Sequence, residues 1–272
     1  MPHLRGGSRR RRPAFCGSVL AGRLVHEPLR SRSSLSEEEN TMKIGIIGAG
    51  QIGGTLTRRF RALGHEVFVA NSRGPATLTE LARETGATAV SVPEAARSGD
   101  VVVIAIPEAK VRDLPSHLFD GVPDSVVVVD TGNYYPRQRD GRIEPIEAGL
   151  TESRWVQQQV ARPVVKAFNS MYARSLAGRG RPAGTAGRIA LSVAGDDGAA
   201  KAVVLCLINE LGFDGVDAGG LDESWRQQPG TPAYCTDLDA EGVRRALSKA
   251  SRERADKWRG TASSPGTFAA PA

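Results

Sequence analysis

The chain has 272 residues, of which 40% are hydrophobic and 24% charged, and its formal net charge at pH 7 is +6. This positive excess lies at the two ends, because residues 42–250 hold 24 basic and 24 acidic side chains. The net charge therefore gives no reason to expect nucleic-acid binding by the central part. No apolar run is long enough to cross a bilayer, and the three widely spaced cysteines form neither a disulfide framework nor a metal motif.

The two ends also differ from the middle in composition. Residues 1–41 are rich in Arg, Ser and Gly and lack hydrophobic periodicity, and residues 251–272 end in a Ser-, Pro- and Ala-rich stretch. Such segments bury too little apolar surface to offset the entropy of ordering them. We expect a disordered basic N-terminal extension at 1–41, a folded domain at 42–250 and a disordered tail at 251–272. Met42 directly precedes the first apolar run and would suit a translation start, and the expected location is cytoplasmic.

Short apolar runs alternate with amphipathic stretches from Lys43 onward. Expected strands, in chain order, are residues 43–48, 65–70, 88–92, 100–107, 125–133, 163–169, 188–195 and 213–219. Expected helices are residues 51–64, 76–86, 93–99, 108–118, 196–212 and 237–258. Near-continuous Val and Ile runs separated by helices predict parallel strands covered on both faces. The predicted fold is an α/β doubly wound, mostly parallel Rossmann sheet extended to about eight strands, with a small C-terminal helical part.

Three glycines follow the first expected strand with the spacing G-x-G-x-x-G. Gly48, Gly50 and Gly53 lie between an apolar strand and an amphipathic helix, which is the context that gives this motif meaning. The first glycine permits a tight turn, the second lets the backbone approach a pyrophosphate, and the third lets helix and strand pack closely. The amides at the helix N-terminus then attract the phosphates. The pattern predicts a dinucleotide site.

The end of the second expected strand lacks the acidic residue that usually binds the adenine ribose of NAD. No Asp or Glu occurs between Val67 and Pro75, and the chain offers Asn71, Ser72 and Arg73 there. An arginine can bind a phosphate with a planar fork of donors, and the two smaller side chains can donate short hydrogen bonds. This stretch favours NADP over NAD. The alternative is an ordinary exposed turn before a helix, which binds no ligand and would have a similar composition.

Polar residues at three later strand ends are candidates for the reacting end of the site. Asn133 and Asn169 are the candidate catalytic residues, and Lys166 is a further polar candidate. Asn133 could equally cap or turn the chain, and Lys166 could lie at an edge or extend to water. No His–carboxylate pair, nucleophile motif or metal-ligand cluster is present. Direct hydride transfer between two ring cofactors needs no strong acid–base group, so this reaction is favoured.

Five segments in this order resemble the NADP-dependent oxidoreductases of the deazaflavin coenzyme F420: "KIGIIGAGQIGGTL", "ANSRG", "VVIAIP", "VVKAFNSM" and "SVAGDDGAAKAVVLCLINELGFDGVDAGGL". The resemblance covers nearly all of residues 42–221. It implies hydride transfer between NADP(H) and a deazaflavin, or a flavin-like acceptor, by a Rossmann protein expected to be a homodimer. The cofactor-binding residues that the resemblance implies are Ala49, Gly50, Gln51, Ile52 and Gly53 in the phosphate loop, Ser72 and Arg73 at the 2′-phosphate, and Ile106, Pro107 and Ala167 beside the nicotinamide. The glycine motif and the strand end add Gly48 and Asn71 to the expected cofactor-binding residues.

Two segments depart from the family pattern, and both are expected near the second substrate. They are residues 168–170 and the polar stretch 224–237. Two other functions therefore stay open. One is NADPH-dependent reduction of a small imine or carbonyl, which needs a proton donor near the ring. The other is a non-enzymatic NADP sensor, which a cleft filled by Trp225 or Tyr234 would favour. The expected partner is a small redox molecule, with no metal, nucleic acid or membrane.

Overall fold

The computed structural model describes residues 41–261, so the predictions for residues 1–40 and 262–272 lie outside the described residues. The strands are β1 Lys43–Ile47, β2 Glu66–Ala70, β3 Thr88–Ala89, β4 Val101–Ile104, β5 Val127–Asp130, β6 Val164–Lys166, β7 Ala190–Val193 and β8 Asp214–Asp217. The α-helices are α1 Gln51–Ala62, α2 Thr79–Thr85, α3 Val92–Ser98, α4 Glu144–Glu147, α5 Glu152–Val160, α6 Ala173–Gly178, α7 Gly198–Glu210 and α8 Ala240–Ser248. Short 3-10 or π turns are η1 Pro75–Leu78, η2 Glu108–Asp113, η3 Pro136–Asp140, η4 Leu221–Gln227 and η5 Asp256–Trp258.

Six strands form one parallel sheet in the order β3-β2-β1-β4-β5-β6. The strand order reverses between β1 and β4, which is where open α/β sheets bind ligands at their carboxyl edge. The prediction of one continuous sheet of about eight strands is wrong, because β7 and β8 pair as a separate two-stranded parallel sheet. A single antiparallel bridge between Lys166 and Ala194 joins the two sheets.

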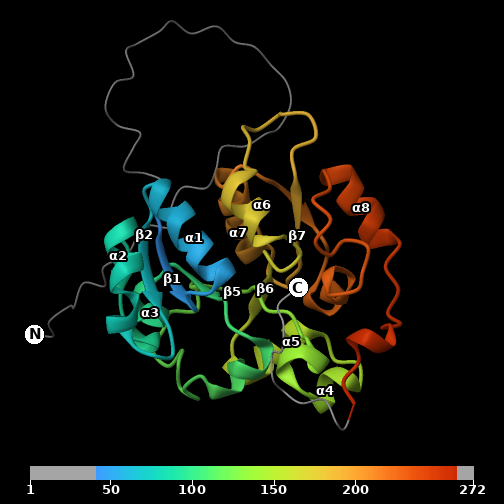
Figure 1. The fold of residues 1–272 in the computed structure, drawn as a ribbon, viewed down its shortest axis with the longest axis horizontal. Helices are drawn as coiled ribbons and strands as arrows, with labels where there is room; N and C mark the ends of the chain where they lie inside the picture. The colour runs from blue at the N-terminus through green and yellow to red at the C-terminus, as the bar shows by residue number, and fades with distance from the viewer. Residues whose placement is uncertain (1–40, 262–272) are drawn as a thin grey trace, which may run out of the picture. The chain divides into compact units, whose positions relative to one another are not determined.

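Apolar side chains alternate along the central strands and bury both faces of the six-stranded sheet, as the sequence predicts. On β4, Val101 and Val103 join a core with α1, α6 and α7, whereas Val102 and Ile104 join a core with α3, α4 and α5. Figure 1 shows α1, α6 and α7 on one side of the sheet and α4 and α5 on the other. The period of two along each strand thus produces the two helical layers.

The C-terminal part is less helical than the sequence suggests. The last expected helix, residues 237–258, is α-helical only from Ala240 to Ser248, with one short 3-10 turn at Asp256–Trp258. Residues 251–261, which sequence analysis assigns to a tail, lie against the domain instead. The Gly260 amide donates to Glu147 Oε1 at 2.6 Å, and Trp258 contacts the ring of Tyr135. These long-range contacts hold an irregular segment that has no periodic signal of its own.

Two further observations concern the described residues alone. No helix within residues 41–261 is long and apolar enough to cross a membrane. In the same part of the chain, no group of three or more His, Cys, Asp or Glu side chains is arranged to hold a metal ion.

Candidate functional site

The glycine loop connects β1 to α1 at the point where the strand order reverses. Gly48 has φ +110°, and a Cβ atom there would lie 2.2 Å from the carbonyl oxygen of Ala105. A Cβ atom at Gly53 would lie 1.8 Å from the Gly48 oxygen, so helix and loop touch backbone to backbone. At Gly50, by contrast, a Cβ atom would meet nothing within 4 Å. The first and third glycines are needed by the fold, and the second leaves space for a ligand.

The N-terminus of α1 is prepared for an anion. Among the helices of nine or more residues in the described part of the chain, α5, α7 and α8 have Thr151, Asp197 and Asp239 as side-chain N-caps. The N-cap of α1 is Gly50, which supplies no side-chain acceptor, and the first turn of α1 contains no acid. The first-turn amides of a helix without a cap need an external acceptor, and a phosphate provides one.

Replacement of Gly50 by alanine should weaken NADPH binding by tenfold or more without lowering stability. The backbone at Gly50 has φ −75°, which alanine adopts readily, and the added methyl group meets only the space that a pyrophosphate would fill. The matched control is Gly198→Ala, at the first residue of α7, where a Cβ atom also meets nothing. NADPH titration by fluorescence and thermal unfolding test both variants. Equal affinity of G50A and wild type would exclude this loop as the phosphate site.

The loop after β2 is held by Asn71 and presents Arg73. Asn71 Oδ1 accepts from the Arg73 amide at 2.9 Å, and Asn71 Nδ2 donates to Thr77 Oγ1 at 2.9 Å. The amide of Asn71 is thus engaged in shaping the turn. Ser72 and Arg73 are exposed, and their side chains make no hydrogen bond or ion pair within residues 41–261. The loop geometry leaves their donors available to a ligand.

The predicted nicotinamide-side residues differ in accessibility. Ile106 and Pro107 follow β4 and are half-buried, and the Ile106 side chain lies against the Gly48 turn. The side chain of Ala167 is fully buried in the core beside Phe168. Ala167 could therefore meet a ligand only through its backbone, whose amide already donates to the Asp130 carbonyl oxygen at 3.1 Å.

Asn133 and Asn169, the two candidate catalytic residues, lie together. Asn133 Nδ2 donates to the Asn169 carbonyl oxygen at 3.0 Å, and Asn169 Nδ2 donates to Asn133 Oδ1 at 3.1 Å. Gln227 completes the set, because its Nε2 donates to Asn169 Oδ1 at 3.0 Å and its carbonyl oxygen accepts from Asn169 Nδ2 at 2.8 Å. These hydrogen bonds join the loop after β6 to the segment after β8, and among the three side-chain amides only Gln227 Oε1 has no partner in the described residues. Phe168, at φ +62°, turns the chain toward these hydrogen bonds.

Sequence analysis missed a buried charge cluster at the carboxyl ends of β4, β5 and β6. It consists of Glu108, Asp130, Glu152 and Lys166, all fully buried. Lys166 Nζ lies 3.0 Å from Asp130 Oδ2 and 3.8 Å from Glu152 Oε2, and it donates to the Gly132 carbonyl oxygen at 2.6 Å. Lys166 lies on β6, the last strand of the six-stranded sheet, but its side chain is fully buried and does not extend to water.

In this buried charge cluster three carboxyl groups lie near one ammonium group, so ionising all three carboxyl groups would be energetically unfavourable. Burial, helped by the negative charge of Asp130, raises the pKa of Glu108 well above its usual range. Burial raises the pKa of Glu152 to about 7, although Lys166 opposes the shift. Burial acts to lower the pKa of Lys166, but Asp130 and the other acids raise it above its usual value. Burial thus favours the protonated form of Glu108 and Glu152, while the neighbouring acids favour the charged form of Lys166.

No local pattern identifies the buried charge cluster in the sequence. Asp130 and Lys166 are visible as polar residues at the ends of apolar strands. Glu108 and Glu152, however, stand at the start of helical segments, where acids are common for reasons of helix capping. Only the sheet order, which places β4, β5 and β6 side by side, brings the four groups together.

The sheet order and the glycine loop define a Rossmann-type fold of the dinucleotide-binding class. Residues 43–134 match the family model described as "NADP oxidoreductase coenzyme F420-dependent". A hypothetical protein from Sinorhizobium meliloti of known structure is 33% identical, with 74% of this chain and 97% of that chain covered and a TM-score of 0.61. The chain belongs to this family of F420-dependent NADP oxidoreductases.

Two other proteins are similar to this chain, and the description of the first names the same kind of activity. A structure described as a "putative f420 dependent nadp-reductase" from Arthrobacter sp. FB24 is 27% identical, covering 66% of this chain and 85% of that chain, with a TM-score of 0.53. The Escherichia coli protein YjhV is 49% identical over 71 residues, which is 26% of this chain. The match spans 52% of YjhV, about half the length of that curated relative.

Proposed function

We propose that this protein transfers a hydride between NADP(H) and a second redox carrier, the deazaflavin coenzyme F420 or a flavin-like acceptor. The observation that carries the proposal is the pairing of an uncapped, acid-free α1 N-terminus at Gly50 with an acid-free loop after β2 that presents Arg73. The first suits a pyrophosphate, and the second suits the 2′-phosphate that distinguishes NADP from NAD.

The residues of this chain would bind and orient the cofactor. The first-turn amides at Gln51, Ile52 and Gly53 would hold the pyrophosphate, while Ser72 and Arg73 would hold the 2′-phosphate. Ile106 and Pro107 would present an apolar surface to the nicotinamide ring, which supplies the hydride when bound. The family name and the Arthrobacter structure's description support F420 as the second carrier. The resemblance also supports a homodimer with a small molecule as its partner.

The buried charge cluster favours a second candidate function, the reduction of a small imine or carbonyl by NADPH. That reaction consumes a proton as well as a hydride, and sequence analysis finds no donor for it. Glu108 directly follows Pro107, the expected nicotinamide contact, and its fully buried carboxyl oxygens have no hydrogen-bond partner in the described residues. Burial raises the pKa of Glu108 and so favours its protonated form, which is the form that donates a proton to a substrate at this edge.

An acceptor panel separates these functions. The protein is mixed with NADPH and, in separate reactions, oxidised F420, FMN, ferric chelates and pyrroline-5-carboxylate, and absorbance is followed. We expect rapid turnover of F420 and slow or no turnover of the others. Turnover of pyrroline-5-carboxylate alone would support the second candidate. Tight NADPH binding without turnover of any acceptor would contradict both and leave an NADP sensor.

A further inference from the structure

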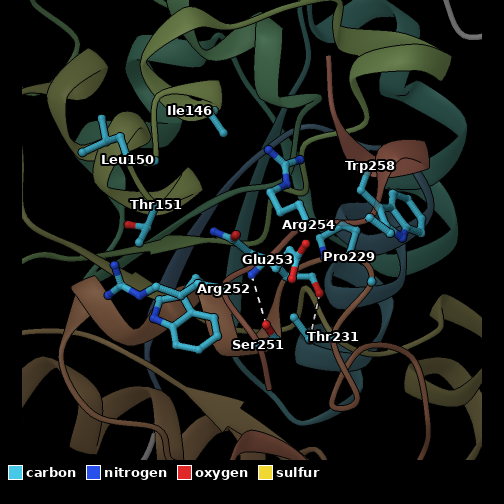
Figure 2. A pocket seen from close by; sticks show the side chains of 15 residues that line it. Ile146, Leu150, Thr151, Pro229, Thr231, Ser251, Arg252, Glu253, Arg254 and Trp258 are labelled. Carbon is cyan, nitrogen blue, oxygen red and sulfur yellow. Dashed lines mark hydrogen bonds between the residues drawn. The ribbon is translucent and has the colours of Figure 1, made fainter. Parts of the chain in front are cut away.

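The guanidinium groups of Arg254 and Arg73 differ in what holds them. Arg254 lines a cavity of about 150 Å³ between the loop joining α4 to α5 and residues 251–258 (Figure 2), and its Nη1 lies 3.6 Å from Glu147 Oε1. Its charge therefore has a partner inside the fold. The Arg73 side chain makes no hydrogen bond or ion pair within residues 41–261. Its position therefore depends on the backbone of the loop after β2, residues 71–78.

The start of this loop is fixed relative to the glycine loop. The Gly48 amide donates to the carbonyl oxygen of Ala70, the last residue of β2, at 2.8 Å. This hydrogen bond joins the two segments that would hold the pyrophosphate and the 2′-phosphate. The loop ends in η1, where Leu78 is buried in the core on the α1 side of the sheet. Both ends of the loop are thus anchored, and the turn at residues 71–74 sets where Arg73 lies between them.

The Asn71 side chain braces this turn in two directions. Its Oδ1 accepts from the Arg73 amide at 2.9 Å, which makes an Asx turn. Its Nδ2 donates to Thr77 Oγ1 at 2.9 Å, and Thr77 Oγ1 donates to the Gly74 carbonyl oxygen at 2.8 Å. These three hydrogen bonds, the Asn71 brace, link both halves of the loop to one side chain.

The residues after Arg73 have little conformational freedom of their own. Gly74 has φ +89° and ψ 163°, a backbone conformation that essentially only glycine adopts. Pro75 then begins η1 with the fixed φ of its ring. The freedom that remains in the turn belongs to Ser72 and Arg73, whose side chains are exposed. The Asn71 brace therefore restrains the two residues that would meet the 2′-phosphate.

We propose that Asn71 is a positioning residue of the 2′-phosphate site, and that it raises the preference for NADP over NAD by holding the turn that presents Ser72 and Arg73. Thr77 acts in the same way, through Asn71. A loop that is ordered before binding loses less conformational entropy when the phosphate binds. NADH lacks this phosphate and gains nothing from an ordered Arg73. The inference rests on the proposed function, because it takes NADP as the ligand of this loop.

Titrations with NADPH and with NADH, followed by cofactor fluorescence, test the proposal without an acceptor and so without turnover. Asn71→Ala should raise the dissociation constant for NADPH by about three- to tenfold and that for NADH by less than twofold. Thr77→Val keeps the shape of the side chain and removes the hydroxyl group, so it should weaken NADPH binding severalfold, whereas Thr77→Ser should restore it. The matched control is Thr79→Val, because the Thr79 hydroxyl donates to the Ala76 carbonyl oxygen at 2.9 Å, outside the Asn71 brace.

The R73A background separates a positioning role of Asn71 from a direct contact. If Asn71 acts through Arg73, N71A should weaken NADPH binding by less than about twofold when it is added to R73A. An equal loss in both backgrounds would mean that Asn71 binds the phosphate itself or disturbs the site in general, and would overturn the proposal. An unchanged NADPH affinity in N71A would also overturn it, as would an equal loss for NADH. If N71A fails to fold, T77V carries the same comparisons.

The single variant R73A tells a failure of this inference apart from a failure of the proposed cofactor. A large loss of NADPH affinity in R73A with no loss in N71A would overturn the positioning role of Asn71 alone. Unchanged NADPH affinity in R73A would remove the 2′-phosphate site from this loop, and with it both the preference for NADP and the role of Asn71.

Discussion

Replacement of Arg73 by alanine is expected to raise the Michaelis constant for NADPH by an order of magnitude or more and to leave the use of NADH nearly unchanged. A charge-assisted hydrogen bond to a phosphate contributes about 1.5–3 kcal/mol to binding. NADPH would lose this bond in the variant, whereas NADH has no 2′-phosphate and never forms it. The Arg73 side chain makes no hydrogen bond or ion pair within residues 41–261, so its removal should not disturb the loop. Steady-state kinetics with both cofactors measure the effect.

Arg83→Ala is the matched control for Arg73→Ala. Arg83 is an exposed arginine on the neighbouring helix α2, and its removal lowers the net charge equally. We expect less than a twofold change in the Michaelis constant for NADPH. If R83A matched R73A, the effect would be one of long-range charge rather than of contact. If R73A impaired NADPH and NADH equally, Arg73 would be structural and the preference for NADP would have no support.

Replacement of Lys166 by methionine should lower the free energy of unfolding at pH 7 by about 3–5 kcal/mol, because it leaves three carboxyl groups buried without a cation. Lys166 is fully buried and pairs with Asp130 at 3.0 Å. Urea denaturation followed by circular dichroism measures the loss. Lys110→Met, at an exposed pair with Asp113, is the control and should cost about 0–1 kcal/mol. A loss in K166M no larger than that in K110M would show that Lys166 does not stabilise the acids.

The dependence on pH distinguishes this electrostatic loss from a packing defect. The pKa of Glu152 is raised to about 7 in the folded protein, against a usual value of 4.5. A carboxyl group with a raised pKa stabilises the fold fully below pH 4.5, and this stability is lost as pH rises toward 7. Lys166 opposes the rise in the pKa of Glu108 and of Glu152, so without it both values should rise further. The K166M deficit should therefore grow from pH 4.5 upward and nearly vanish below it. A deficit that is constant with pH would indicate lost packing instead.

Most features of the fold and of the cofactor site that could be predicted depend on residues that lie close together in the sequence. The parallel α/β architecture is confirmed, because continuous Val and Ile runs such as Val101–Ile104 can be buried on both faces only inside a layered sheet. The strand–glycine–helix context of Gly48–Gly53 is also local, since Gly53 packs on the backbone of Gly48, Gly48 packs on the chain just after the adjoining strand β4, and Gly50 faces open space. The phosphate loop and the acid-free loop after β2 could therefore be assigned a role from their spacing.

Long-range assembly accounts for what could not be predicted. Whether β7 and β8 extend the main sheet depends on hydrogen bonds between strands far apart in sequence, and these form only one bridge, at Lys166. The buried charge cluster combines residues from three strand ends and one helix, and the raised pKa values of Glu108 and Glu152 arise from burial that exists only in the folded chain. The same holds for Arg254 and Trp258, which look like tail residues until the chain folds back over the loop between α4 and α5. Local spacing specifies turns, caps and faces, whereas burial, charge coupling and cavities are set by contacts that the linear order of residues does not contain.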